Sequence, residues 1–263
     1  AVRDTLKASR IVVGAKDAKA AQAMKGLYEP FELPVILTDR RSSEMIKYAS
    51  NDFLALKISY INEIANLCEL VGANIDDVAT GMGYDNRIGR LFLKAGIGYG
   101  GSCFPKDTKA LFWLSEFHGY EMKTVKAAID VNEEQKFILI KKSRKYYDTL
   151  AGKTVAVLGL TFKPGTDDLR EAPSLKIVPA LLAEGARVKA WDPVVGDKTR
   201  SRLPEGVEYC PSIDKTVKGA DLCMILTEWP EVVGYDVTSY AKLMRRGIVI
   251  DGRNCYNTQD MMG

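Results

Sequence analysis

Lys153-Thr154-Val155-Ala156-Val157-Leu158 begins the part of the chain whose fold is easiest to predict. Its nearly uninterrupted apolar residues are typical of a strand that is covered on both faces. Three more such strands follow, at 187–191, 222–226 and 247–251. A helix is expected at 174–184, and strands that alternate with helices form a parallel, doubly wound sheet. We therefore predict an α/β fold with a Rossmann-like domain over residues 151–263.

The carboxyl ends of these strands are where a ligand would bind. The first strand runs into Gly159-Leu160-Thr161-Phe162-Lys163-Pro164-Gly165, which lacks the G-x-G-x-x-G pattern of dinucleotide-binding turns. Residues 96–101 match that pattern, but no strand precedes them, so a substrate-facing loop is expected there. Lys163 and Arg170 are cations suited to phosphate contacts. The turn predicts a nucleotide site without an NAD signature, and the alternative is an ordinary loop with solvated charges.

Residues 42–150 are expected to form helices only. The first helix, over 42–71, has apolar residues at every third or fourth position, Ser42 and Ser43 can cap it, and Gly72 ends it. At 1.5 Å per residue it would be roughly 45 Å long, so it would span two domains or form the core of a dimer. Further helices are expected at 74–81, 87–94, 104–119 and 123–147.

Residues 1–41 resemble the end of another domain more than a domain of their own. Two strands at 10–14 and 34–38 flank a helix at 18–28. Such a piece cannot bury a core alone, so it must pack on a partner.

Gly100-Gly101-Ser102-Cys103-Phe104-Pro105-Lys106-Asp107 places a thiol where a loop becomes a helix. Pro105 suits the first helical position, and the positive end of the helix dipole lowers the pKa of a cysteine from about 8.5. The glycines at 96, 98, 100 and 101 leave room for a substrate to approach the backbone. Cys103 is therefore a candidate nucleophile, and Asp107 either assists it or only complements the helix dipole.

Composition excludes several classes of function. Acids and bases are interspersed along the 263 residues, with a net charge of +3, which argues against a nucleic-acid surface. No apolar run is long enough to cross a membrane. Five cysteines without a C-x-x-C pair indicate reduced thiols in a cytoplasmic protein. Because His118 is the single histidine, a metal site built on histidines or a Ser-His-Asp triad is nearly excluded.

Lys47 and Asn51 are four residues apart on the long helix, so they project from one face. Taken alone they favour a solvated polar strip. However, Lys47-Tyr48-Ala49-Ser50-Asn51-Asp52-Phe53-Leu54-Ala55 resembles the catalytic helix of the UDP-glucose/GDP-mannose dehydrogenase family, and residues 100–107 resemble its cysteine motif. Shorter matches recur in the expected order, at 162–163, 170–171, 227–229 and 251–253. The resemblance covers nearly the whole chain.

This resemblance implies an NAD-dependent, four-electron oxidation of UDP-glucose to UDP-glucuronate. Cys103 would attack the C6 aldehyde to give a thiohemiacetal, which is then oxidised to a thioester. Lys47 and Asn51 would stabilise the negative oxygen, and Asp107 would help to position water and Lys47. Two alternatives are a dehydrogenase of GDP-mannose or another nucleotide sugar, and a non-catalytic dimerisation and nucleotide-binding module.

The resemblance also implies which residues bind each ligand. Lys106 would face the nicotinamide of NAD, and Arg170 would contact the phosphates of NAD. The sugar and diphosphate of the substrate would lie along residues 94–100, which include Lys94, Gly98, Tyr99 and Gly100. The uridine and its phosphate would contact Phe162 and Lys163. Arg87 and Arg253 would contact the substrate across the interface of a homodimer.

Enzymes of this family begin with an NAD-binding domain that carries a true G-x-G-x-x-G and a general-base glutamate. Residues 1–41 would be a remnant of that domain. Residues 42–150 would be the central helical dimerisation domain, and 151–263 the UDP-binding domain. The chain as given is expected to retain the thiol and the sugar-nucleotide half of the site, but not to bind NAD well or turn over.

Overall fold

The computed structural model describes residues 8–194 and 196–257. The chain folds as two compact units, Ala1–Phe53 and Leu54–Gly263. Helix α3 (Arg40–Val71) continues from the first unit into the second. The predicted division at 41/42 and 150/151 remains a prediction.

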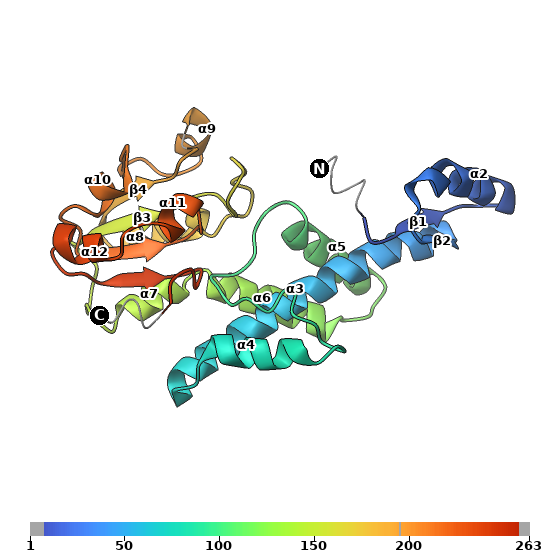
Figure 1. Cartoon of the computed structure of the whole chain (residues 1–263), viewed down its shortest axis with the longest axis horizontal. Coiled ribbons are helices and arrows are strands. Elements are labelled where there is room, and N and C mark those ends of the chain that lie inside the picture. The colour runs from blue at the N-terminus through green and yellow to red at the C-terminus, as the bar shows by residue number, and fades with distance from the viewer. Residues whose placement is uncertain (1–7, 195, 258–263) are drawn as a thin grey trace. The chain divides into compact units, whose positions relative to one another are not determined.

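The first unit contains two parallel strands and a helix, as predicted. Strand β1 (Ile11–Gly14) pairs with β2 (Val35–Thr38), and α2 (Ala18–Tyr28) and the short η1 (Glu29–Phe31) connect them (Figure 1). No described residue of α2 is buried, which agrees with the expectation that this piece has no core of its own.

Helix α3 begins two residues earlier than predicted, and an aspartate caps it. The carboxylate of Asp39 accepts hydrogen bonds from the Ser42 backbone N–H at 3.0 Å and from the Ser42 hydroxyl at 2.6 Å. The prediction that Ser42 or Ser43 caps the helix is therefore wrong, because an earlier side chain already accepts from the first turn. Gly72 ends the helix with φ +75°, as predicted.

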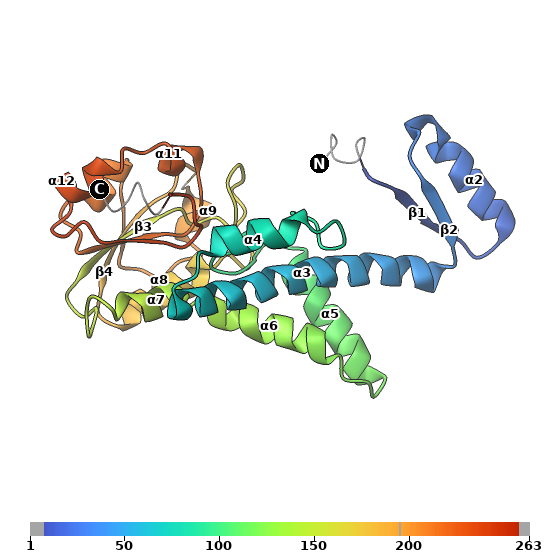
Figure 2. The same cartoon turned by 60° about the horizontal axis from the view of Figure 1, so that its bottom comes forward.

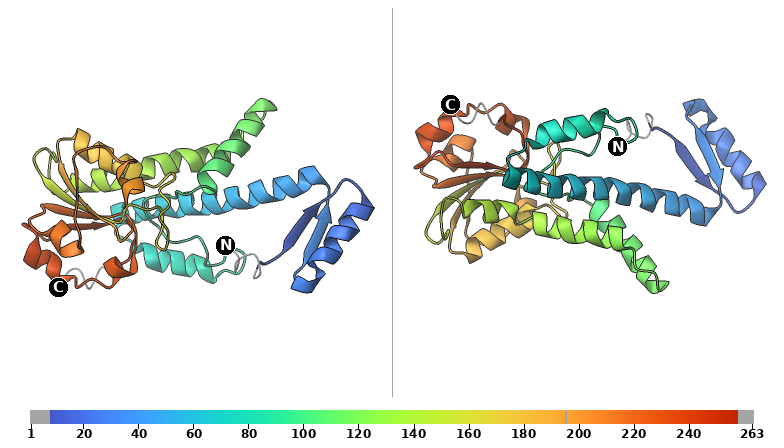
Figure 3. Two further views of the ribbon diagram at one scale, coloured as in Figure 1. Left: turned by 90° about the horizontal axis from the view of Figure 1, so that it is seen from above. Right: turned by 90° about the horizontal axis from the view of Figure 1, so that it is seen from below.

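Four more helices make up the rest of the central region. They are α4 (Ile75–Tyr84), α5 (Phe104–Phe117), α6 (Lys123–Gln135) and α7 (Ile138–Ser143). Figures 2 and 3 show α4 and α6 on either side of the second half of α3. The Ser59 hydroxyl donates to the Ala128 carbonyl at 2.7 Å, and Ile61 packs with Ile75 of α4.

Two helix predictions in this region are wrong. Residues 87–94 form turns, because Gly89 and Phe92 adopt φ values of +69° and +64°, which a right-handed helix excludes. The helix predicted over 123–147 is broken after Gln135, where the Phe137 N–H bonds to the Glu134 carbonyl, three residues back, at 3.1 Å.

The remainder of the second unit is a five-stranded parallel sheet in the order β5-β4-β3-β6-β7. The strands are β3 (Thr154–Leu158), β4 (Arg187–Trp191), β5 (Val207–Tyr209), β6 (Leu222–Ile225) and β7 (Val249–Asp251). This confirms the predicted doubly wound α/β fold. Strand β5 was not predicted, since its three residues are exposed or half-buried and show no apolar run.

Both faces of the sheet are covered, which explains the apolar run of β3. Helix α8 (Ser174–Ala183) packs on one face; α10 (Ile213–Val217), α11 (Pro230–Val233) and α12 (Thr238–Leu243) pack on the other, and α9 (Asp197–Arg200) follows β4 (Figure 1). The strand order reverses at β3, so the loops after β3 and β6 separate at the point where ligands bind such sheets. None of the helices in the described residues is both long and apolar enough to cross a bilayer.

Candidate functional site

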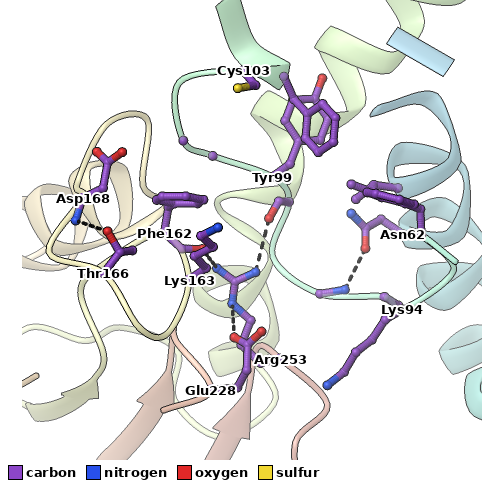
Figure 4. A pocket seen from close by; sticks show the side chains of 18 of the residues that line it. Asn62, Lys94, Tyr99, Cys103, Phe162, Lys163, Thr166, Asp168, Glu228 and Arg253 are labelled. Carbon is purple, nitrogen blue, oxygen red and sulfur yellow. Dashed lines mark hydrogen bonds and ion pairs between the residues drawn. The ribbon is translucent and has the colours of Figure 1, made fainter. Parts of the chain in front are cut away.

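A cavity of about 700 Å³ opens between the glycine loop of the central region and the carboxyl ends of the sheet strands (Figure 4). Its volume lies within the range of about 300–1,000 Å³ that is usual for small-molecule sites. The structure brings many of the predicted site residues to its wall: Lys94, Gly98, Tyr99, Gly100, Cys103, Phe162, Lys163 and Arg253. Residues that were not predicted also line it, among them Asn62, Phe92, Asp168 and Glu228.

The glycine loop is fixed by buried amide side chains of α3 and α6. The Asn132 carboxamide accepts from the Tyr99 N–H at 2.7 Å and donates to the Tyr99 carbonyl at 3.2 Å. The Gly96 N–H donates to Asn62 at 2.8 Å, and Gln135 donates to the Gly96 carbonyl at 2.7 Å. All three amide side chains belong to residues that are at most 5% exposed. The backbone of the loop is therefore set before any ligand binds.

The glycines of this loop are also needed for a reason that was not predicted. A Cβ atom at Gly98 would lie 2.7 Å from the Asn132 side chain, and one at Gly100 would lie 2.4 Å from the Glu171 carbonyl oxygen. Gly101, with φ +81°, would meet the Phe162 ring at 2.8 Å. Other parts of the protein thus take the space that the missing side chains leave. The four glycines also line the cavity, so the approach of a substrate to their backbone stays a prediction.

Cys103 is exposed and occupies the position just before the first residue of α5. Pro105 is the second helical residue, one position later than predicted. The Asp107 N–H donates to the Cys103 carbonyl at 2.9 Å, and the buried Asp107 carboxylate lies 2.5 Å from the Lys106 ammonium. Cys103 thus lines the cavity at the N-terminal end of α5.

Lys106 and Arg170, the two predicted cofactor residues, line a neighbouring cavity of about 340 Å³. This second cavity shares Gly101 and Ser102 with the first. Lys109 and Arg202 also line it. Asp168 pairs with Arg170 at 2.7 Å.

This ion pair shifts both pKa values. The Arg170 guanidinium lowers the pKa of the Asp168 carboxyl from its ordinary 3.8. In turn Asp168 and, to a smaller extent, Cys103 raise the pKa of Arg170. Both groups therefore stay charged beside the second cavity at neutral pH.

The turn that carries Phe162 and Lys163 is organised by Asp192, a buried residue at the end of β4. One Asp192 carboxylate oxygen accepts from the Leu160 N–H at 2.7 Å, the Thr161 N–H at 3.2 Å and the Trp229 indole N–H at 3.0 Å. Asp192 thus connects the segments that follow β3, β4 and β6. Its place directly after an apolar strand, beside a proline, was the one signal in the sequence.

Arg253 joins the two loops around the cavity. Its guanidinium donates to the Leu226 carbonyl at 2.6 Å, the Phe162 carbonyl at 3.3 Å and the Gly98 carbonyl at 3.4 Å, and lies 3.4 Å from the Glu228 carboxylate (Figure 4). Burial lowers the pKa of the Arg253 guanidinium, and Glu228 opposes this shift.

Four predicted site residues do not line either cavity, and one of them is Asp107, which is buried beside Lys106. Arg87 lies in the turn after α4, exposed and paired with Asp85 at 2.6 Å. Lys47 and Asn51 belong to the first unit, near the start of α3, and project from one face of that helix. Their roles toward a ligand remain predictions.

Asn62, Asn132 and Gln135 were missed because sequence reasoning treated polar residues of helices as solvated. The signal was present, since Asn62 lies among the apolar residues of α3, beside Ile61 and Ile64. A polar residue within an apolar helix face has to find a buried partner.

Comparison with known proteins identifies both parts of the chain that form the cavity. Residues 41–134 match the central domain of the UDP-glucose/GDP-mannose dehydrogenase family, and residues 156–258 match its UDP binding domain. The UDP-glucose 6-dehydrogenase YwqF of Bacillus subtilis is 49% identical over 262 residues, which are 100% of this chain and 60% of that protein.

Two solved structures are also similar. A UDP-glucose dehydrogenase from Pyrobaculum islandicum has a TM-score of 0.92 and 38% identity, over 99% of this chain and 59% of that one. A UDP-D-ManNAc dehydrogenase from Pyrococcus horikoshii has a TM-score of 0.83 and 29% identity, over 98% and 59%. This chain therefore spans about 60% of the length of the relatives it matches. The cysteine loop, the sheet and these two domain matches agree: the chain belongs to the UDP-glucose/GDP-mannose dehydrogenase family.

Proposed function

We propose that this chain carries the thiol and the sugar-nucleotide site for an NAD-dependent oxidation of UDP-glucose to UDP-glucuronate. The observation that carries the proposal is that Cys103 opens on the same cavity as Lys94, Lys163 and Arg253. The wall of this cavity carries a thiol at one part and cations elsewhere. This arrangement suits a nucleotide sugar, because the thiol can react at C6 of the sugar and the cations can bind the diphosphate. The names of the relatives support UDP-glucose as the substrate.

The chemistry requires a thiol because an aldehyde is a poor hydride donor. In the first oxidation the C6 alcohol would lose the proton of its hydroxyl and a hydride from C6, which gives the aldehyde. The Cys103 sulfur then adds to the aldehyde carbon: a C–S bond forms, the C=O π bond breaks, and its electron pair moves to the oxygen, which becomes alkoxide-like. That oxygen helps the C6–H bond to break with its electron pair. The thioester that results is attacked by water, which supplies the second carboxylate oxygen and returns the thiol. NAD, when bound, accepts the hydride in each of the two oxidations.

Lys47 and Asn51 would donate hydrogen bonds to the alkoxide, the role of an oxyanion hole. Asp107, which is fully buried and 2.5 Å from the Lys106 ammonium, would orient water and Lys47. Its burial in the helix that Cys103 precedes supports a fixed carboxylate close to the thiol.

Binding would be divided between the two cavities. Phe162 and Lys163 would hold the uridine and its phosphate, and residues 94–100 the sugar and diphosphate. The second cavity carries the cations of Lys106, Lys109, Arg170 and Arg202, a charge that fits the phosphates of NAD. The described residues contain no strand followed by G-x-G-x-x-G, so the turn that binds a dinucleotide in this family is not provided by them.

A homodimer through the central helices is also proposed. Tyr60, Leu67, Leu70 and Tyr84 are 49–84% exposed, which leaves apolar surface on α3 and α4 for a second copy. Arg87, next to this surface along the chain, would then contact the substrate of the partner. Light scattering should give twice the chain mass.

The five cysteines are free thiols, which supports the expectation of a reducing cytoplasm.

The test of the thiol is Cys103→Ser, measured as NADH formation in the protein as its gene encodes it. Loss of the nucleophile should reduce kcat by at least about 1,000-fold while UDP-glucose still binds. Cys210→Ser, which removes a partly exposed thiol from β5's end, is the matched control and should keep full activity. Full turnover by Cys103→Ser would contradict the covalent route.

Calorimetric titration of this chain tests the substrate. UDP-glucose should bind more tightly than GDP-mannose and UDP-N-acetylmannosamine. Tighter binding of either competitor would overturn the choice of substrate. Binding of UDP-glucose without any turnover in the protein as encoded would favour the non-catalytic module.

A further inference from the structure

Glu171 adopts a backbone conformation that glutamate rarely takes. Its φ of +51° lies in the left-handed region, which is unfavourable for a residue with a Cβ and a long side chain. Such conformations persist only where the surroundings impose them, and they concentrate at functional sites. This one lies next to the loop that leads to Cys103.

The backbone of the turn at Arg170 and Glu171 is in direct contact with that loop. The Gly101 N–H donates to the Arg170 carbonyl at 2.7 Å. The Glu171 carbonyl is so close to Gly100 that a Cβ there would lie 2.4 Å from its oxygen. If Glu171 changed its backbone conformation, the position of the two glycines before Cys103 would change as well.

Two lysines converge on the Glu171 carboxylate. Lys136, at the end of α6, is 1% exposed and is the one lysine among the buried residues of the described chain. Its ammonium lies 2.7 Å from Glu133 and 3.8 Å from Glu171. The Lys109 ammonium of α5 also lies 3.8 Å from the same Glu171 oxygen. A buried ammonium requires anionic partners, and Lys136 has Glu133 as the nearer one and Glu171, whose side chain is 42% exposed, as the farther one.

These contacts link α5, α6 and the turn at 170–171 around the loop that leads to Cys103. Helix α5 begins directly after Cys103, and Lys109 lies in its second turn. Helix α6 fixes Tyr99 and Gly96 through its buried amides. Glu171 contacts charged side chains of both helices, while its backbone contacts Gly100 in the loop that precedes α5.

We propose that Glu171 is a positioning residue for Cys103. Its carboxylate, bound between Lys136 and Lys109, holds the turn at 170–171 in its strained conformation, and the carbonyls of the turn hold Gly100 and Gly101. The thiol is thereby fixed relative to both cavities. The consequence for catalysis rests on the proposed function, whereas the consequence for the reactivity of the thiol does not.

The experiment measures how fast iodoacetamide modifies Cys103, followed by peptide mass spectrometry. Glu171→Gln keeps the shape and removes the charge, and should slow modification of Cys103 by at least about fivefold. Lys136→Met should slow it by a similar factor, and the double variant should be little slower than either alone. Lys126→Met is the matched control, because it breaks a 2.7 Å ion pair with Asp130 on the exposed face of the same helix.

Two results would overturn the proposal. One is a Glu171→Gln protein that melts at a lower temperature but keeps the wild-type rate of Cys103 modification, which would make Glu171 merely structural. The other is a Glu171→Ala protein with the wild-type rate, since alanine lacks the carboxylate but keeps the Cβ that disfavours the left-handed conformation. In the active protein, Glu171→Gln should lower kcat more than it raises the KM for the sugar nucleotide. If wild type oxidises no sugar nucleotide, the modification rates still decide the positioning role, so the two failures are distinguishable.

Discussion

The two loops that wall the main cavity are held in place in different ways. Residues 96–101 are held by side chains of other elements, the amides of α3 and α6 and the guanidinium of Arg253. Residues 159–168 are held within the sheet domain, by Asp192 after β4 and by Thr227 after β6, whose hydroxyl donates to the Thr161 carbonyl at 2.5 Å.

The two loops therefore depend on different parts of the protein. The first loop depends on the central helices as well as on Arg253 and the turn at 170–171, so a change in those helices can alter the site without disturbing the sheet. The second loop depends on the carboxyl ends of the strands, so a change there destabilises the sheet domain itself. The four substitutions below test this division.

Gly100→Ala should have the largest effect on stability. The new Cβ would lie 2.4 Å from the Glu171 carbonyl oxygen and 3.0 Å from the carbonyl carbon. Both are backbone atoms, so the chain itself would have to shift to relieve the clash. We expect the free energy of unfolding to fall by about 3 kcal/mol or more in chemical denaturation. Gly81→Ala, on α4 with nothing within 4 Å, is the control and should stabilise the chain slightly. A Gly100→Ala protein as stable as wild type would refute the close approach.

Asp192→Ala tests the second loop. It leaves the buried N–H groups of Leu160, Thr161 and Trp229 without their acceptor. The free energy of unfolding should fall by about 2–3 kcal/mol. Trp229→Phe removes one of these hydrogen bonds and should cost about 1 kcal/mol. If Asp192→Ala costs no more than Trp229→Phe, the carboxylate does not organise the turn.

Asn132→Ala tests the first loop, where binding should suffer as well as stability. Loss of both hydrogen bonds to Tyr99 should cost about 1–2 kcal/mol of unfolding free energy and weaken UDP binding by about tenfold. Asn74→Ala removes the cap of α4 and should cost about 1 kcal/mol without changing UDP affinity. Equal losses of affinity in both variants, measured by calorimetry, would show that the amide has no special role in the loop.

Much of the fold could be predicted, because it follows from local patterns. The apolar run at 153–158 predicted β3, and the alternation of strands and helices predicted the doubly wound sheet. The motif at 100–107 predicted a thiol at the start of a helix. In these cases neighbouring residues determine the result.

The parts that could not be predicted depend on contacts between distant residues. Phe92 adopts a left-handed conformation that no residue preference suggests, so the helix predicted at 87–94 was wrong. Asn132 and Asp192 find their partners 33 and 32 residues away. Such pairings depend on how the helices and strands pack, which the periodicity of a sequence does not reveal.

The smallest effect on stability is expected from removing the Asp–Arg ion pair in either of two similar turns. Asp168 and Arg170 beside the second loop, and Asp85 and Arg87 in the central region, form the same turn, with the arginine N–H bonded to the aspartate at 2.9 Å in both. The arginine lowers the pKa of the aspartate in both cases. A lowered pKa in the folded state means stability that is present above the ordinary value of 3.8 and is lost as the pH falls through the folded value.

Wild type should therefore be more stable than Asp168→Asn by about 0.5–1 kcal/mol at neutral pH, and the difference should be lost as the pH falls below the ordinary value of 3.8. The Asp168 side chain is 18% exposed and that of Asp85 35%, so Asp85→Asn should show a smaller difference because water screens that pair more. Denaturation curves of the three proteins over this pH range provide the measurement. A difference that grows as the pH falls, or a larger effect at Asp85, would contradict the assignment of the lowered pKa to the Asp168–Arg170 pair.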